Sequence, residues 1–435
     1  MNLFDLSLRL SGFDIASARQ ELARIKAIPE NEYGSYLIKK KQEILSYHIE
    51  NNTFYKNLIG ENPDLSWENL PIMTKSDLQQ PLQNRLSHGY TAKNSHIHKT
   101  SGSSGHPFIF AKDKKSHALS WASFYDRYSW YNIDLSKDLQ ARFYGIPLKG
   151  LPHYRERLKD KLSSRYRFSI FDLSQKNLES FVEHFKQMPF IYVNGYTSSI
   201  VLFAKYLKER KIRLNVICPT LKLCIVTSEM LFDEDRTLLE EQLGIPVANE
   251  YGASETGLIA FEGPNKDLAI DHELLYVEVV DNNDVVLQNG EMGRIIITSL
   301  YNTAHPFIRY DIGDLGTLST KSTLKKPVLL KLGGRVNDIA KLPSGKIVPG
   351  LTFYYVTKKV IDNSAFVKEF VATQLKIDSF LIEYVAERNL SEKEIVKINN
   401  AIAKYLEPNL NVDFRRLSHL DRSKRGKLKQ FQSLI

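Results

Sequence analysis

The sequence contains few cysteines and no long uncharged apolar run. Only Cys218 and Cys224 are present among 435 residues, too few to stabilise such a chain by disulfides, and their spacing differs from the CxxC pattern of redox and metal sites. We expect both to be small buried side chains in a protein of the reducing cytoplasm. No apolar stretch approaches the ~20 residues that span a bilayer. The N-terminal segment contains Asp5, Arg9 and Asp14 and lacks the apolar core of a signal peptide.

Glycine and proline are also scarce and scattered, at 22 and 16 residues, which excludes collagen-like and low-complexity sequence. Hydrophobic residues make up 43% and charged residues 25%, values of a globular chain rather than a disordered one. The length favours a large body with a smaller second domain. Basic side chains gather between Arg415 and Lys429 and contribute to the net charge of +9. Because aromatic residues do not interleave with them, we expect no nucleic-acid partner; a solvated tail and a basic binding module are the other interpretations.

Apolar patterns indicate mostly helix in the first 85 residues, with clear helical spacing over 36–49. Strands and helices then alternate. Strands are expected at 141–145, 190–195, 221–226 and 245–248, and helices at 178–185, 198–208 and 235–243. This alternation predicts an α/β fold with a largely parallel sheet that is covered on both faces.

The pattern changes after residue 270. Apolar segments at 273–281 and 293–300, separated by polar turns, predict antiparallel strands. In the last hundred residues, strands are expected at 369–377, 379–386 and 411–415, around a helix that begins with a capping box of Ser391 and Glu394. This order predicts a small α+β domain of ferredoxin-like kind, with its boundary near Gly333–Arg335.

A run of small polar residues is the most distinctive local motif. It comprises Thr100, Ser101, Gly102, Ser103, Ser104 and Gly105. Such a loop exposes backbone N–H groups and hydroxyls with little side-chain bulk, as the binding of a phosphate chain requires. It is not a Walker A loop, a Rossmann fingerprint or a nucleophile elbow. A flexible Ser/Gly linker is the alternative.

Three further motifs place reactive or charged side chains in loops or at strand ends. After the last expected parallel strand, Tyr251 offers a ring that can stack on a base, and Glu255 offers a carboxylate for magnesium. Asp314 and Arg335 are natural partners of ribose hydroxyls and phosphate. Lys427 follows a glycine near the C-terminus and can reach a cleft as a point charge. Considered singly, the first motif is better explained as a strand-to-loop turn and the last as a solvated tail, and a surface ion-pair turn is the alternative for Asp314 and Arg335.

In this order and at these separations, the motifs resemble those of the adenylate-forming superfamily of acyl-CoA synthetases, luciferases and nonribosomal adenylation domains. Within it, the chain looks like the phenylacetate–CoA ligase branch, and more narrowly like members found with capsular and surface polysaccharide genes. The resemblance covers nearly the whole chain. The narrower placement rests on Leu70-Pro-Ile-Met-Thr-Lys75, Asn194-Gly-Tyr-Thr-Ser198, Thr227-Ser-Glu-Met-Leu231, Asn302-Thr-Ala-His-Pro306 and Gly426-Lys-Leu-Lys429.

The resemblance implies a large N-terminal α/β domain at 1–334, in which mixed and parallel sheets covered by helices accompany an antiparallel β-subdomain. It implies a hinge at 335–338 around Asn337 and a small mobile α+β domain at 339–435. Because the phenylacetate–CoA ligase branch often dimerises, a homodimer is an expected assembly.

The resemblance also implies roles for the motif residues. Residues 100–105 would hold the β- and γ-phosphates of ATP, Tyr251 would stack on adenine, and Glu255 would bind Mg²⁺. Asp314 would bind the ribose with help from Arg335. Further residues expected at the nucleotide are Ser228, Glu229, Asn249, Glu250, Gly252 and Ser254. Side chains expected at the acid pocket are Tyr144, Tyr196 and Ala253.

The implied activity is that of an AMP-forming acid–thiol ligase. ATP would activate an organic carboxylic acid as an acyl adenylate with release of pyrophosphate, and Lys427 would contact both the carboxylate and the α-phosphate. The acyl group would then pass to a thiol, with coenzyme A the expected acceptor, after a domain rotation that brings residues 345–349 to the site. The alternatives are transfer to a carrier or to a sugar amine in surface polysaccharide biosynthesis, and a nucleotide-binding protein without turnover.

Three departures from the family pattern stand out. The lysine that often follows the proline of the phosphate loop is absent, and Phe108 and Ile109 stand there, so the charge of the pyrophosphate has to be met by another group. Asn337 replaces the usual Asp or Lys at the hinge. The cysteines that hold zinc in some relatives have no counterpart, so we expect no zinc.

Overall fold

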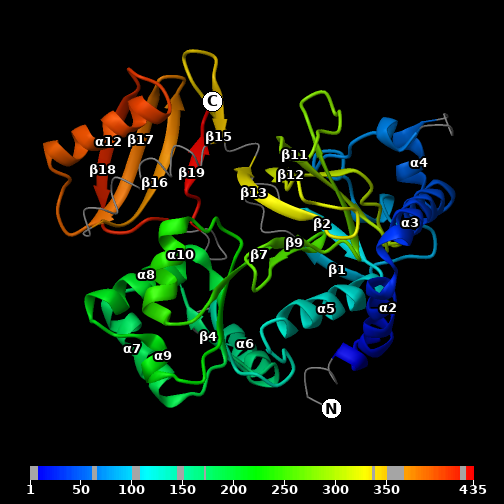
Figure 1. The fold of residues 1–435 in the computed structure, drawn as a ribbon, viewed down its shortest axis with the longest axis horizontal. Coiled ribbons are helices and arrows are strands. Elements are labelled where there is room, and N and C mark those ends of the chain that lie inside the picture. The colour runs from blue at the N-terminus through cyan, green and yellow to red at the C-terminus, as the bar shows by residue number, and fades with distance from the viewer. Residues whose placement is uncertain are drawn as a thin grey trace.

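The computed structural model describes residues 8–60, 66–99, 108–144, 151–170, 173–335, 339–349, 367–421 and 428–435. An N-terminal helical layer lies along one side of the molecule (Figure 1). It consists of α2 (Ile15–Ala27), α3 (Glu30–Asn51) and α4 (Thr53–Ile59). Helix α3 contains the helix expected at 36–49 and buries Leu37, Ile44 and His48.

From residue 66 to residue 95 the chain forms short helical turns and, at Met73, an isolated β-bridge with Tyr310. The turns are the 3-10 helices η1 (Trp67–Asn69) and η2 (Leu82–Asn84). The expectation of mostly helical structure is wrong for this stretch, because Pro71 and Pro81 interrupt the backbone hydrogen bonds of a longer helix. A hairpin of β1 (His96–Lys99) and β2 (Ile109–Lys112) follows.

A mixed sheet of 11 strands forms the body, in the order β10-β11-β12-β13-β9-β8-β7-β6-β5-β3-β4. Its parallel half consists of β3 (Gln140–Tyr144), β4 (Arg165–Ser169), β5 (Tyr192–Tyr196), β6 (Leu223–Thr227) and β7 (Val247–Ala253). Its antiparallel half consists of β8 (Gly257–Glu262), β9 (Leu268–Ile270), β10 (Leu275–Val280), β11 (Met292–Ser299), β12 (Tyr310–Leu318) and β13 (Val328–Arg335). The expected change from parallel to antiparallel strands is confirmed, but it occurs before residue 270, where β7 pairs with β8.

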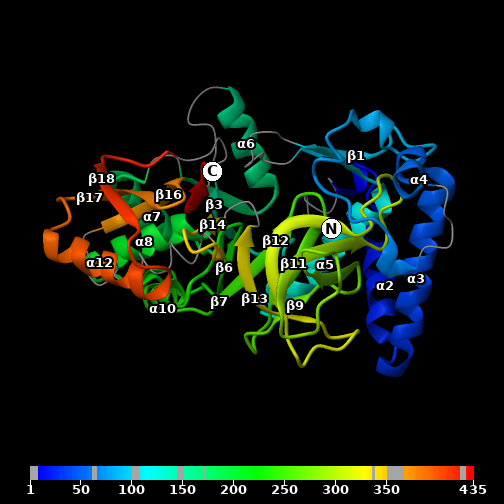
Figure 2. The same cartoon turned by 90° about the horizontal axis from the view of Figure 1, so that it is seen from above.

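Helices cover both faces of the parallel half, as the alternation of strands and helices predicts. They are α5 (Lys114–Ser129), α6 (Leu151–Leu162), α7 (Gln175–Gln187), α8 (Thr197–Glu209), α9 (Leu214–Ile217) and α10 (Asp233–Leu243). Strand β6 shows the two-sided burial: Cys224 and Val226 pack in the cluster with α7, α8 and α10, whereas Ile225 packs in another with Tyr128 of α5. Figure 2 shows α6 standing out beyond the sheet.

Gly195, in the Asn194–Ser198 segment, lies where the close packing of two strands leaves no room for a side chain. A Cβ atom on Gly195 would lie 2.6 Å from the backbone oxygen of Phe143 on the neighbouring strand β3. Any side chain would therefore push β3 and β5 apart. Close approach of these two strands also sets the position of the residues at their carboxyl ends.

The C-terminal part has its own sheet, in the order β18-β17-β16-β19, with helix α12 packed on it (Figure 1). Its elements are β14 (Ile339–Lys341), β15 (Ile347–Pro349), β16 (Val367–Lys376), β17 (Ser379–Ala386), α12 (Glu392–Tyr405), β18 (Asn411–Leu417) and β19 (Phe431–Ser433). The expected order of two strands, a helix and a strand is confirmed, and so is the capping box of Ser391 and Glu394. The domain limits at 334 and 339 stay a prediction.

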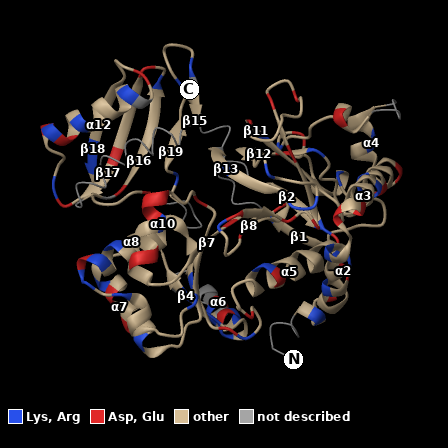
Figure 3. Ribbon diagram, in the orientation of Figure 1, with Lys and Arg blue, Asp and Glu red and all other residues tan. Residues whose placement is uncertain are grey.

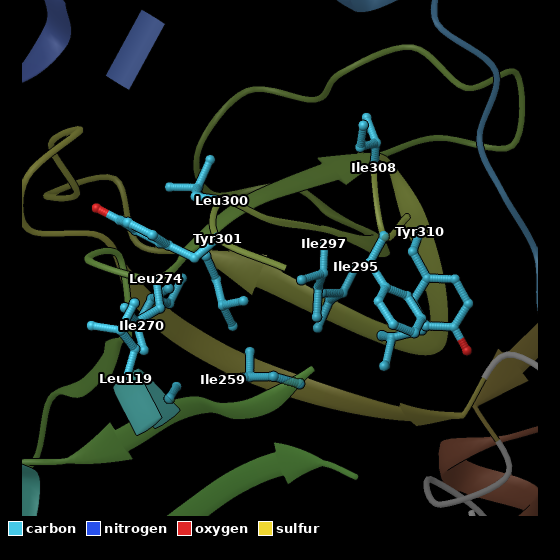
Figure 4. Packing of buried hydrophobic residues seen from close by; sticks show 14 of the residues in the cluster. Leu119, Ile259, Ile270, Leu274, Ile295, Ile297, Leu300, Tyr301, Ile308 and Tyr310 are labelled. Atoms are coloured by element: carbon cyan, nitrogen blue, oxygen red, sulfur yellow. The ribbon is translucent and has the colours of Figure 1, made fainter. Parts of the chain in front are cut away.

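A large apolar cluster joins the antiparallel half of the sheet to α2, α3 and α5. Figure 4 shows part of it, with Ile259, Ile295 and Ile297 of the sheet in its centre. In the same view the ring of Tyr310 packs beside Ile295, while its hydroxyl points away from the cluster. Tyr310 thus anchors β12 in the core and presents a polar group at the core's edge.

Both cysteines are free and buried, as expected. None of the helices in the described part of the chain is long and apolar enough to span a membrane. Figure 3 shows acidic and basic residues interspersed along the helices, with acidic residues gathered on α10.

Candidate active site

Tyr251 and Asp314 come together from the two halves of the sheet. Tyr251 lies near the end of β7 and Asp314 lies on β12, and the Tyr251 hydroxyl donates a 2.7 Å hydrogen bond to Asp314 Oδ2. Both side chains are half-buried. The bond orients the ring and the carboxylate, so a surface for stacking and an acceptor for hydroxyl groups occupy one place. The backbone of Arg335 on β13 lies directly opposite Asp314.

Glu255 occupies the turn between β7 and β8. Its side chain is only 9% exposed, and the Tyr310 hydroxyl donates a 3.2 Å hydrogen bond to its Oε1 atom. The adjacent hydroxyl of Thr256 is buried and has no hydrogen-bond partner among the described residues. Mg²⁺ commonly binds through one or two protein carboxylates together with substrate phosphates, so this oxygen-rich turn fits that ion. No group of three or more His, Cys, Asp or Glu side chains in the described chain could hold a metal by itself.

Lys112 is a candidate site residue that sequence analysis missed. It ends β2 and is 5% exposed, and its Nζ lies 3.3 Å from the point where a Cβ atom on Gly257 would stand. Burial lowers the pKa of Lys112 to about 8, while Glu255 and Asp113 oppose this shift. The ammonium group therefore lies at the Glu255 turn, on the strand that follows the 100–107 segment.

A signal for Lys112 was present in the sequence. It stands in a run with Asp113, Lys114 and Lys115, which resembles an exposed charged segment. However, Phe110 precedes it by two residues and is buried, and successive residues of a strand alternate between faces. Lys112 thus continues the buried face of β2.

Glu250 is held from two sides at the end of the parallel half. Its Oε2 accepts a 2.8 Å hydrogen bond from the hydroxyl of Tyr128 on α5. Burial raises the pKa of Glu250, and the hydrogen bonds from Tyr128 and Thr227 together with the charge of Arg142 oppose this shift. The side chain of Glu250 is thus tied to α5 and β6.

The structure brings two of the three expected acid-pocket residues together. The rings of Tyr144 and Tyr196 lie 4.5 Å apart, and both pack with the apolar cluster under α7 and α8. Ala253 packs instead against the cluster that contains Tyr251. Sequence position alone did not separate these two locations, because they differ in the apolar cluster against which each side chain packs.

The Ser228–Glu229 loop links the two domains. Glu229 Oε2 accepts a 2.7 Å hydrogen bond from the backbone N–H of Ser198 at the start of α8, and its Oε1 accepts a 3.1 Å bond from the backbone N–H of Leu428. Ser228 has a positive φ of 69°, which turns the chain sharply after β6. Phe232, just beyond the loop, is buried in the apolar cluster of the C-terminal domain.

The remaining residues expected at the nucleotide lie along β7 and its turn. The backbone N–H of Asn249 donates a 2.8 Å hydrogen bond to Glu262. Gly252 and Ser254 are exposed beside Tyr251. A Cβ atom on Gly252 would lie 2.8 Å from the backbone oxygen of Gly257, so the turn is tight at this point.

Several expected site residues lie outside the described residues. They are Thr100, Ser101, Gly102, Ser103, Ser104, Gly105, Asn337 and Lys427.

Other segments on which the resemblance rests form hydrogen bonds that hold neighbouring elements together. The side chain of Asn302 donates to Ala111 O and accepts from the N–H of Asp113, which fixes the junction between β2 and α5. Arg309, fully buried, donates to the backbone oxygens of Glu68 and Leu70. These contacts hold β2 and β12 in place beside the site, which explains why such residues belong to the pattern.

Comparison with known proteins gives matches in sequence and structure, although no family model matches. Protein CapK of Staphylococcus aureus is 23% identical over 374 residues, which cover 82% of this chain and 79% of that protein. The phenylacetate-coenzyme A ligase of Pseudomonas putida is 31% identical over 134 residues, 30% of each chain.

A solved 2-hydroxyisobutyryl-CoA ligase has the same fold. In its postadenylation state with a hydroxyacyl adenylate it superposes with a TM-score of 0.73, at 16% identity, over 94% of this chain and 91% of that chain. In its thioesterification state, with the adenylate and CoA, the TM-score is 0.60 at the same identity and coverage. The chain therefore has the adenylate-forming ligase fold with a separate C-terminal domain, and its resemblance to the phenylacetate–CoA ligase branch of that superfamily is confirmed.

Proposed function

We propose that the protein is an AMP-forming ligase that activates an organic carboxylic acid with ATP and transfers the acyl group to the thiol of coenzyme A. The observation that carries the proposal is the convergence of Tyr251, Asp314, Glu255 and Lys112 at one edge of the sheet. This convergence places a stacking ring, a hydroxyl acceptor, a metal-binding carboxylate and a buried cation together. These are the groups that the binding of a nucleoside triphosphate requires. The fold and the sequence relatives support the same activity.

In the first half-reaction a carboxylate oxygen of the acid attacks the α-phosphorus of ATP, and the bond to the β-phosphate oxygen breaks. The products are an acyl adenylate and pyrophosphate. Charge develops on the phosphate oxygens, so cationic and N–H donors fixed at those positions lower the barrier. Mg²⁺ held by Glu255 would neutralise part of this charge.

Each residue then has a defined task. Tyr251 would stack on adenine and Asp314 would bind the ribose, with Ser228, Glu229 and Asn249 around the nucleotide. Residues 100–105 would bind the β- and γ-phosphates. Lys112 would supply the positive charge that the loop lacks at Phe108 and Ile109. Lys427 would bridge the carboxylate and the α-phosphate.

In the second half-reaction a thiolate sulfur attacks the acyl carbon and AMP leaves. The described contact of Leu428 with Glu229 holds the segment after Lys427 against the large domain, as adenylation would require. The higher TM-score to a postadenylation structure than to a thioesterification structure supports the same interpretation. Rotation about the 335–338 hinge would then exchange Lys427 for residues 345–349.

The similarity to CapK supports a second candidate, in which the acyl acceptor is a sugar amine or a carrier in polysaccharide biosynthesis. This candidate shares the first half-reaction and differs only in the nucleophile. A nucleotide-binding protein without turnover is the third. The proposed compartment for each is the cytoplasm.

Pyrophosphate exchange into ATP with a panel of acids tests the proposal. We expect acid-dependent exchange that falls at least tenfold in Glu255→Gln and in Asp314→Ala, because each variant removes a charged contact worth about 1.5–3 kcal/mol. Addition of coenzyme A to the active acid should release AMP and form the thioester. An acyl adenylate that accumulates without thioester formation would favour the amine acceptor, and binding of ATP without exchange for any acid would reject the ligase.

A further inference from the structure

Helix α6 exposes apolar side chains along one side. Tyr154 is 71% exposed, Leu158 is 60% exposed and Leu162 is 43% exposed. Because these residues are spaced four apart within the helix, they lie above one another on one face. The helix itself stands out beyond the sheet (Figure 2). The three side chains therefore form an apolar stripe along a projecting element.

The opposite side of α6 carries the acidic residues that attach the helix to the body. Asp160 is only 2% exposed, and its Oδ1 accepts hydrogen bonds of 2.7 Å from Arg165 and 2.8 Å from Arg167 of β4. A carboxylate oxygen of Glu156 lies 3.2 Å from Arg167 Nη2. A surface helix ordinarily buries its apolar side and exposes its charges, so α6 has the reverse arrangement.

Basic residues flank the stripe on the helix surface. With about 3.6 residues per turn, Lys159 lies on one side of the stripe, and Arg157 and Lys161 lie on the other. Lys159 pairs with Glu156 at 2.8 Å, yet segment 155–167 contains six basic and two acidic residues, a net charge of +4. An apolar stripe between basic residues, with a surplus of positive charge, is the pattern of a helix that lies in a membrane interface.

Charge complementarity decides which partner covers the stripe. A second copy of the chain would bring the same surplus of positive charge to the contact, which opposes pairing. An anionic bilayer offers phosphates at the level of the flanking lysines and an acyl region below them for the stripe. Tyr154 suits this boundary, since its ring is apolar and its hydroxyl is polar. A projecting helix also reaches a flat surface without needing a matching groove.

We propose that α6 binds the surface of an anionic lipid bilayer, with its apolar stripe among the headgroups and with Lys159 and Lys161 at the lipid phosphates. The binding is peripheral, because a helix of 12 residues is too short to cross a bilayer. It is also reversible, because only a few apolar side chains enter the interface. The proposal goes beyond the ligase activity and does not depend on it, since α6 contributes no residue to the nucleotide site described above.

Co-sedimentation of the full chain with lipid vesicles tests the proposal. Vesicles of equal parts phosphatidylglycerol and phosphatidylcholine are compared with vesicles of phosphatidylcholine alone, each at low and at high salt. At low salt we expect the protein to partition into the anionic vesicles about tenfold more strongly, or better, because several basic residues act together. High salt should remove this difference, because it screens the charges.

Two variants of exposed residues place the binding on α6. Leu158→Ser should weaken partitioning into anionic vesicles about tenfold or more, since a leucine no longer leaves water. Lys161→Gln should weaken it about fivefold, since one charge near the surface is lost. The matched controls are the exposed Val396→Ser on α12 and Lys208→Gln on α8, which should bind like wild type. Thermal unfolding shows that each variant is folded, and exposed positions of this kind contribute little to stability.

Three results would overturn the proposal. One is wild-type protein that binds neither kind of vesicle or binds both equally. Another is unchanged anionic binding in folded Leu158→Ser or Lys161→Gln, which would place the binding elsewhere, as on the basic residues between 415 and 429. The third is a wild-type dimer in sedimentation equilibrium that dissociates in Leu158→Ser, which would assign the stripe to a second copy of the chain.

Discussion

Lys112 was identified as a candidate site residue only in the structure. It lies at the Glu255 turn, where the phosphate loop motif lacks the usual lysine. Lys112→Met should weaken binding of ATP and of pyrophosphate about tenfold or more, because one buried charge partner of the phosphates is lost. Affinity for AMP should stay within about twofold, because AMP lacks the β- and γ-phosphates. Calorimetry with the three ligands measures both effects.

Lys114→Met is the matched control, since Lys114 is exposed two residues further along at the start of α5. Equal losses for ATP and AMP in Lys112→Met would show that the lysine supports the fold of the site rather than the phosphates. Affinities unchanged for all three ligands would remove Lys112 from the site.

At this scale the sequence predicted the chemical types of residues better than their contacts. Tyr251 and Asp314 were both expected at the nucleotide, but their hydrogen bond joins residues 63 positions apart, on strands β7 and β12 that have β8, β9 and β13 between them in the sheet. Lys112 was missed because its charged neighbours indicate exposure and outweigh the alternation that continues the buried face from Phe110. A contact between residues so far apart in the chain, such as that of Tyr251 with Asp314, has no local signature.

The elements were easier to predict than the residues, except where pairing extends a strand. The strand expected at 245–248 runs on to Ala253, because β7 bonds to β6 on one side and to β8 on the other. Tyr251 therefore lies within a strand, not in a loop after it. The alternation of apolar residues defines a strand's buried face, but the last residues of β7 are held by neighbours that the local sequence does not reveal.

The loop between β6 and α10 carries the second prediction. Glu229 accepts backbone hydrogen bonds from Ser198 and from Leu428, so it joins the loop to α8 and to the C-terminal segment. Glu229→Ala should lower the rate of adenylation about tenfold, because losing a charge-assisted hydrogen bond costs about 1.5–3 kcal/mol in the arrangement that holds Leu428. It should also increase proteolytic cleavage after residue 421. Single-turnover adenylation and limited proteolysis measure the two effects.

Glu241→Ala on the exposed side of α10 is the control for Glu229→Ala. If adenylation in Glu229→Ala equals that of wild type, the contact with Leu428 plays no part in the first half-reaction. A fall in rate without a change in cleavage would instead place the effect at Ser198 and α8.

The stability of the whole large domain should depend on pH through a buried histidine. Burial lowers the pKa of His48 to about 4, and its Nε2–H donates a 2.9 Å hydrogen bond to Asn302 O. The unfolded chain binds this proton near pH 6.5, so stability is complete above that pH and falls as the pH drops towards 4. At pH 5 the loss from His48 alone amounts to about 2 kcal/mol.

His48→Gln keeps a hydrogen-bond donor but cannot titrate, so the difference in unfolding free energy between pH 7.5 and pH 5 should shrink by about 2 kcal/mol. All three tryptophans, Trp67, Trp121 and Trp130, lie in the large domain, and their fluorescence during urea unfolding reports on it. An identical pH dependence in the variant and the wild type would show that His48 is not the titrating group.

The last prediction concerns the movement of one domain against the other. Leu428 is fixed to Glu229 of the large domain, so the residue before it, Lys427, enters the proposed site only while the domains keep this arrangement. Lys427→Ala should slow adenylation roughly 10²- to 10³-fold, as the loss of one oriented donor to developing charge does. It should leave transfer from a supplied acyl adenylate nearly intact, because rotation about residues 335–338 has by then removed Lys427. Pyrophosphate exchange and single-turnover transfer separate the two steps, with the exposed Lys429→Ala as control. Equal, small effects in both variants would show that the segment is a solvated basic tail. Equal loss of both half-reactions in Lys427→Ala would contradict the proposed rotation between two domain arrangements, but it would leave the ligase activity in place.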